Sequence, residues 1–190
     1  MKTKLLMLAV ACGCTFAGSA MATTKAEYKA EKTRISTEYK VNKDKCSPMK
    51  ANAKDICISE AKGMEKVAKA EAKAMYEPSA KHTKGVAVAK ADSMYDTAKE
   101  KCDDLSGNAK DVCVKDAKAA FVKMREDANV AKAATDTTKT KNAKMASVQK
   151  DATEDKKDAD YKAAKERCDA LAGVPKDTCQ NDAKVKFGMK

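Results

Sequence analysis

The chain has 190 residues, of which 35% are charged and 4% aromatic, with no tryptophan and a formal net charge of +11 at pH 7. Much of its nominally hydrophobic content is alanine, which buries little area per residue, so a single large hydrophobic core is excluded. Two alternatives remain: a largely unstructured chain, or thin helical units held together by something other than burial.

Residues 1–22 have the features of a secretory signal peptide. Lys2 and Lys4 precede an apolar run of small residues, and Ala20-Met21-Ala22 matches a small-residue cleavage site. We expect cleavage there, export to the periplasm, and no membrane span in the mature chain. The alternatives are a retained anchor, for which the apolar run is short, and a lipoprotein modified at Cys12.

Three copies of one motif follow. Each has a tyrosine, a cysteine seven residues later, and a Lys-Asp-x-Cys whose cysteine lies eleven residues after the first; the copies begin at Tyr39, Tyr95 and Tyr161. Apolar residues recur at steps of three and four on both sides of a short break, which predicts two antiparallel helices per copy. In the second copy Gly107 is expected to end the first helix and Asn108 to cap the next. The repeated Asp55, Asp111 and Asp177 are interpreted as charges in the first turn of the return helix.

The predicted fold is therefore all-α, an elongated tandem array of three helical hairpins with flexible connections. The hairpins are expected at residues 23–76, 88–133 and 147–190, the last with a short return helix. The linkers are expected at 77–87 and 134–146.

In an antiparallel hairpin, the numbers of two residues that face each other add to the same total along the whole seam. This rule predicts which residues pair across each hairpin. The sum that pairs Cys102 with Cys113 also pairs Ala98 with Ala117, Tyr95 with Ala120 and Ala91 with Met124. The first copy in the same way pairs Tyr39 with Met64, Ile35 with Ala68 and Tyr28 with Met75, and the third pairs Ala164 with Ala183. Cleavage would remove Cys12 and Cys14, and the six cysteines that remain allow fifteen pairings. The repeat predicts Cys46–Cys57, Cys102–Cys113 and Cys168–Cys179. Each bridge should stabilise its hairpin by roughly 3 kcal/mol in the chain-entropy model.

Catalytic, cofactor-binding and metal-binding residues are not predicted. The two cysteines of each copy are spaced too far apart for a Cys-x-x-Cys redox motif. The one histidine, His82, lies in the first predicted linker, and Met64, Met75 and Met124 are assigned to the hairpin core. The sequence contains no recognisable Ser/His/Asp set and no glycine-rich phosphate loop.

The excess of lysine is the remaining signal. Glu65–Lys69 and Asp111–Lys115 are interpreted as pairs within one helix, on a solvated surface. The functional alternative is loose attraction to anionic envelope polymers or lipid head groups. Nucleic acid is disfavoured by export and by the scarcity of arginine.

The segments YKAAKERCDALAGVPKDTC and YDTAKEKCDDLSGNAKDVC resemble uncharacterised exported proteins of Gram-negative bacteria that carry tandem Y-K-x-A-K-x-K-C-D-x-L-x-G-N-A-K-D-x-C motifs. Some of these are labelled TolA-like envelope proteins. The resemblance covers most of the mature chain and implies a periplasmic location without an activity.

Three functions are therefore considered. The first is a non-enzymatic structural or interaction protein of the envelope, with anionic envelope components as partners. The second is a holdase chaperone for unfolded periplasmic proteins, and the third, least favoured, is an exported thiol-redox or metal-handling protein.

Overall fold

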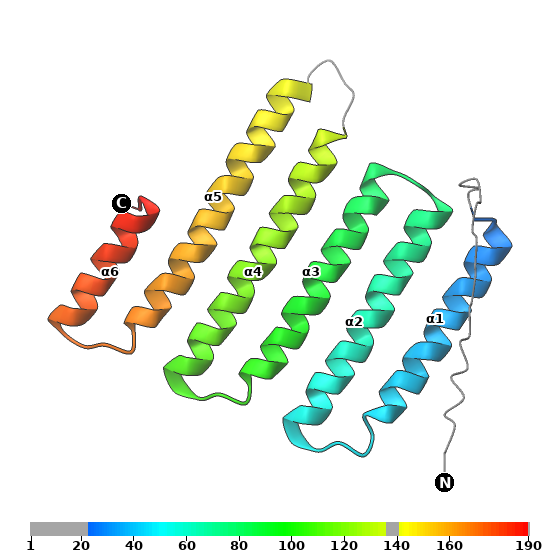
Figure 1. Ribbon diagram of the computed structural model, residues 1–190, viewed down its shortest axis with the longest axis horizontal. Coiled ribbons are helices and arrows are strands. Elements are labelled where there is room, and N and C mark those ends of the chain that lie inside the picture. Colours follow the sequence, from blue (N-terminus) through cyan, green and yellow to red (C-terminus); the bar gives the residue numbers. More distant parts are fainter. Residues whose placement is uncertain (1–22, 136–140, 190) are drawn as a thin grey trace, which may run out of the picture.

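The computed structural model describes residues 23–135 and 141–189, and this part of the chain contains helices and no strands. In chain order they are α1 (Lys25–Lys45), α2 (Ala51–Tyr76), α3 (Ala80–Cys102), α4 (Gly107–Ala134), α5 (Lys141–Cys168) and α6 (Val174–Phe187). The helices lie side by side in a single layer and alternate in direction, so that α1 and α6 form its two edges (Figure 1). The predicted all-α array is confirmed. The predicted signal peptide lies outside the described residues.

A disulfide joins the two helices of each hairpin, as predicted. The bridges are Cys46–Cys57, Cys102–Cys113 and Cys168–Cys179, each with its Cα atoms 5.7 Å apart. Ala61 and Ala183, one turn after Cys57 and Cys179, are buried on the seam. Small side chains let the two backbones approach closely enough for the bridge to form.

The first connection is much shorter than the predicted linker 77–87. Helix α3 already begins at Ala80, because Ser79 caps it by accepting a hydrogen bond from the His82 backbone N–H at 3.2 Å. His82 also contacts the end of the preceding helix, with its Nδ1 2.6 Å from the Glu77 carbonyl oxygen. The predicted linker 134–146 is likewise partly helical, since α4 ends at Ala134 and α5 begins at Lys141. Residues 136–140 of that linker lie outside the described residues.

Aromatic pairs close each hairpin seam away from its disulfide. Tyr95 contacts Phe121, with ring centroids 5.1 Å apart, and Tyr28 stacks on Tyr76 at 4.5 Å. The predicted partners, Ala120 for Tyr95 and Met75 for Tyr28, were each one position off. The prediction that Met64 and Met75 lie in the core was wrong, since they are 54% and 57% exposed. The constant-sum rule fixes the height of a residue along the seam, but its side chain can turn outward while the next residue turns in.

The hairpins also pack against one another, through contacts that occur twice at equivalent positions of the repeat. Asn52, at the start of α2, donates from Nδ2 to the Glu100 carbonyl oxygen at the end of α3, at 2.7 Å. Asn108 makes the same bond from α4 to the Glu166 carbonyl oxygen of α5, at 3.0 Å. The same residue type therefore ties neighbouring hairpins together near both turns.

The roles predicted for Gly107 and Asn108 were both wrong. Helix α3 ends at Cys102, and Gly107 is the first residue of α4. Ser106 is the N-cap residue of α4. The Asn108 amide is turned toward α5, because a partner for it lies there in the next hairpin.

Ion pairs reinforce both contacts between hairpins. Glu60 bonds Lys101 and Glu71 bonds Lys90 across α2 and α3, at 3.3 and 2.9 Å. The residues at the equivalent positions of α4 and α5 also pair: Asp116 with Arg167, and Asp127 with Lys156. The predicted pair Glu65–Lys69 is present at 2.6 Å, but Lys115 approaches Glu166 of the next hairpin, at 4.0 Å, instead of Asp111.

Small residues let these helices approach. Gly63 packs so closely on α3 that an added Cβ would lie 1.9 Å from the Ser93 Oγ. At the equivalent place in the second contact, Ala119 packs with Ala159. The three hairpins thus form one continuous array with two kinds of interface, covalent and aromatic within a hairpin, and polar with small residues between hairpins.

Candidate functional site

The six cysteines predicted as site residues serve the fold. All are in disulfides, and Cys46, Cys102 and Cys168 are at most 1% exposed. Such bridges form and persist in oxidising surroundings, which indicates an extracellular or periplasmic environment. Within residues 23–135 and 141–189, no group of three or more His, Cys, Asp or Glu side chains is arranged to hold a metal ion.

The other residues singled out in the sequence are not brought together. Asp55, Asp111 and Asp177 are exposed at the starts of three different helices, and only Asp177 lies in a first turn. His82 closes the connection between α2 and α3. The candidate site therefore has to be found on the surface.

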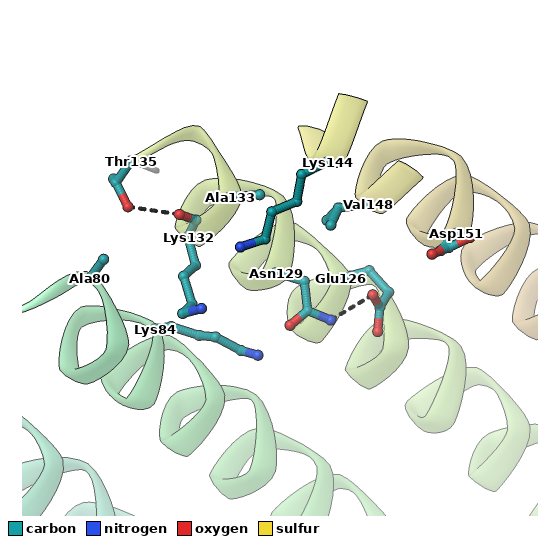
Figure 2. Close-up of a pocket in the computed structure, with 10 residues that line it drawn as sticks. All are labelled: Ala80, Lys84, Glu126, Asn129, Lys132, Ala133, Thr135, Lys144, Val148 and Asp151. Atoms are coloured by element: carbon teal, nitrogen blue, oxygen red, sulfur yellow. Dashed lines mark hydrogen bonds between the residues drawn. The ribbon is translucent and has the colours of Figure 1, made fainter. Parts of the chain in front are cut away.

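Two adjoining hollows on one side of the array provide it. One, of about 490 Å³, lies between α3 and α4, and the other, of about 360 Å³, lies among the ends of α3, α4 and α5. Lys84 and Lys132 line both hollows, so the two adjoin. Figure 2 shows these two side chains extending toward each other from α3 and α4, with Lys144 approaching from α5.

Four cations surround the first hollow, and we refer to them as the basic cluster: Lys81, Lys84, Arg125 and Lys132. Lys81 and Lys84 follow the capped start of α3, so they lie near the positive end of the helix dipole. Arg125 and Lys132 are seven residues apart, which places them two turns apart on one face of α4. The guanidinium carbon of Arg125 lies 5.4 Å from the centre of the Phe121 ring, which steadies that side chain.

The four members of the basic cluster form no ion pair in the described part of the chain, although Asp92 lines the same hollow. Glu77 is also near: its pKa is lowered first by a hydrogen bond from Lys73 and further by the charge of Lys81. The ion pairs of Lys66, Lys90, Lys101, Lys123, Lys156 and Arg167 lie between hairpins. The nearby acids have other partners: Asp92 bonds Lys66 at 2.7 Å, and Glu126 accepts from the Asn129 amide at 2.7 Å (Figure 2). The hollow can therefore attract an anion by direct contact and by the local field.

Sequence reasoning missed this cluster because Lys81 and Lys84 fell in a predicted linker. The charge pattern gave no distinct signal: Lys84 and Arg125 have no acid three or four residues away, but the same is true of many lysines of this chain. Only an earlier start of α3 places Lys84 beside α4.

None of the helices in the described ranges is both long and apolar enough to cross a membrane. Comparisons with protein-family models, curated proteins and solved structures find no match to this chain.

Proposed function

We propose that the protein is an exported, non-enzymatic component of the bacterial envelope that binds anionic polymers of the periplasm through the basic cluster. The signal-peptide features of residues 1–22 support export, and the three disulfides fit the oxidising periplasm. The stapled array supplies a rigid support, and the hollow supplies the binding surface.

One observation carries the proposal. Lys81, Lys84, Arg125 and Lys132 gather around one hollow within the second hairpin, and none of them forms an ion pair in the described part of the chain. Like charges held together on a rigid surface repel one another, and a polyanion relieves that repulsion. Binding of this kind weakens as salt rises, because the contacts are exposed and screened.

The test is co-sedimentation of the purified protein with isolated peptidoglycan sacculi, at low and at high salt. A variant in which all four residues of the basic cluster are changed to Gln should lose most of its binding. The matched control changes four other lysines without ion pairs to Gln: Lys29, Lys40, Lys43 and Lys62. Both variants lose the same charge, so the comparison isolates position.

The expected result is strong binding by the native protein and the control at low salt, with little binding by the cluster variant. Equal losses in both variants would show that only net charge matters and would contradict a defined site. Absence of binding by the native protein at low salt would overturn the proposed function.

Exposed methionines favour holdase activity as a second candidate. Met64, Met75 and Met94 are 54%, 57% and 59% exposed on α2 and α3. Flexible, polarisable methionine side chains suit surfaces that accept varied apolar partners. The native protein should then suppress aggregation of a chemically denatured client at near-stoichiometric ratio, and a variant with Gln at these three positions should not. No suppression by the native protein would remove this candidate.

A further inference from the structure

The contact between hairpins is a repeated interface with two distinct halves. One half is the outward side of a return helix, α2 or α4, and the other is the facing side of the next first helix, α3 or α5. Its charged element recurs at equivalent positions, as Glu60–Lys101 in the first contact and Asp116–Arg167 in the second. The array forms this interface twice. One half of it is left without a partner half at each edge of the array.

At the C-terminal edge of the array, the half of the interface that a return helix contributes is unused. Within the described part of the chain, α6 packs on α5 alone. Asp182 stands where Glu60 and Asp116 stand in the earlier copies, and among the described residues it has no ion pair. Val174 and Val185, on the same outward side, are 77% and 81% exposed.

The N-terminal edge carries the complementary half. Among the described helices, α1 packs on α2 alone. Lys45 stands where Lys101 and Arg167 stand in the later copies, and its Nζ donates to the Asn42 side chain of its own helix, at 3.1 Å. Val41 is 51% exposed at the position of Thr97, the residue that meets Ser59 of the preceding hairpin, with their hydroxyl oxygens 3.3 Å apart.

We infer that two copies of this chain associate head to tail, with the outer side of α6 of one chain docked on the outer side of α1 of the next. Asp182 then pairs with Lys45 of the second copy, as Glu60 pairs with Lys101 within a chain. In this register Val185 of one copy faces Thr37 of the other, one turn from Val41, and Val174 lies over the last turn of α1, so apolar surface at both edges is removed from water. Continuity with an interface that the fold already uses twice, together with opposite charges at the two edges, identifies the partner as a second copy.

The contact between chains is weaker than the contact within a chain, for a steric reason. Within the chain the close approach depends on Gly63 against Ser93 and on Ala119 with Ala159. At the edges Val185 and Thr37 occupy these positions, and both are larger. Val174 also replaces the asparagine whose amide bonds the next hairpin. We therefore expect reversible association that depends on concentration and salt.

A head-to-tail contact leaves one edge of each chain free. It therefore extends into open arrays and does not stop at a symmetric dimer. This inference is independent of the proposed polymer binding, because the basic cluster lies on α3 and α4, away from both edges.

Sedimentation velocity over a range of protein concentrations at low salt tests the inference, on protein with its three disulfides intact. The native chain should show a rising, continuous distribution of sizes. Asp182→Lys alone and Lys45→Asp alone should each weaken association at least about tenfold, because each sets like charges against each other. An equimolar mixture of the two variants should assemble again, since the introduced lysine of one meets the introduced aspartate of the other.

The rescue on mixing separates this inference from misfolding, because a damaged fold would not recover by mixing. Asp104→Lys and Lys29→Asp are the matched controls, since they reverse exposed charges outside the two docking surfaces and should leave association unchanged. A second route replaces Val185 and Thr37 by Ala, which copies the Ala119–Ala159 pair and should tighten association. A native chain that stays monomeric at every concentration, or single variants that associate like the native chain, would overturn the inference.

Discussion

Position 51 shows how one residue departs from its repeat. Gly107, the first residue of α4, and Gly173, the N-cap of α6, have φ of +56° and +60°, and Ala51 holds the equivalent position in the first copy with φ of +48°. A left-handed conformation places Cβ close to the following carbonyl oxygen, at a cost of roughly 1–2 kcal/mol for a non-glycine residue. The first hairpin is therefore strained at a place where the other two are not.

Ala51→Gly should raise the free energy of unfolding by about 0.5–1 kcal/mol, which is the relieved strain minus the extra chain entropy that glycine loses on folding. Urea denaturation with the disulfides intact measures this change. Gly107→Ala is the mirror control and should destabilise the protein by a similar amount. Equal stability of all three proteins would show that the left-handed turn carries no strain.

A charge in the third hairpin makes its turn sensitive to acid. The Lys176 ammonium donates to Asp169 at 2.8 Å and holds the pKa of that carboxyl below its usual value. A carboxyl with a lowered pKa in the folded state stabilises the fold at neutral pH, and this contribution is lost as the pH falls through the folded-state pKa. In the first hairpin the equivalent position is Ser47, which has no charge to titrate.

Asp169→Asn should therefore be less stable than the native protein at neutral pH, and the difference should vanish as the pH falls below the ordinary range of aspartate. Thermal unfolding at a series of pH values measures it. The contribution is small because both side chains are exposed. A difference that persists unchanged into strong acid would rule out a charge effect.

At the scale of elements, the disulfide pairing could be predicted and the packing between hairpins could not. Cys102 and Cys113 lie at equal heights on either side of a turn, and the copies repeat that arrangement, so each bridge was determined by local spacing. The surface charges had no such constraint. Lys115 could pair with Asp111 in its own helix or with Glu166 in the next hairpin, and only the structure shows the second.

The short first connection was missed for a related reason. Glu77-Pro78-Ser79 correctly indicated a break, but the lysine-rich residues after it were interpreted as a continuing linker. Ser79 caps α3, and packing on α2 supplies the stabilisation that the local sequence lacks. Two members of the basic cluster lie in that first stretch of α3, so the error in the element hid the candidate site.

The close contact at Gly63 provides a test of the packing between hairpins. Gly63→Ala places a Cβ 1.9 Å from the Ser93 Oγ and should destabilise the protein by about 1 kcal/mol, as the overpacking exceeds the gain in helix propensity. The double variant with Ser93→Ala removes the Oγ clash but leaves the added Cβ 2.9 Å from the Cβ at position 93, so it should recover most of the loss and not exceed the native stability. Urea denaturation measures both; a single variant as stable as the double one would mean that α2 and α3 do not approach this closely.

At the scale of the whole molecule, the stability of each helix depends on its position in the single layer, because position sets how many neighbours support it. The central hairpin is supported on both sides, by α2 and by α5, whereas α6 is held by α5 alone. Such arrays gain stability from each unit and from each contact with a neighbour. Helix α6 has only 14 residues, so it is short for a helix that must persist with one neighbour.

Loss of the disulfide should therefore destabilise the C-terminal hairpin more than loss of the equivalent disulfide destabilises the central hairpin. Replacing Cys168 and Cys179 by Ala should release α6, because its one packed side does not offset the ordering of a short helix once the loop is no longer closed. Replacing Cys102 and Cys113 by Ala should leave α3 and α4 helical, because contacts with α2 and α5 still order them.

Hydrogen exchange followed by mass spectrometry separates the two outcomes by segment. In the edge variant, peptides from α6 should exchange as freely as an unfolded chain while α1–α5 remain protected. In the central variant, protection in α3 and α4 should fall without being lost, since removal of a disulfide from a small secreted domain costs about 2–5 kcal/mol and the neighbouring contacts oppose that loss. If α3 and α4 lost protection while α6 kept it, each hairpin would depend on its own bridge alone, and the contacts between hairpins would contribute little to the stability of the array.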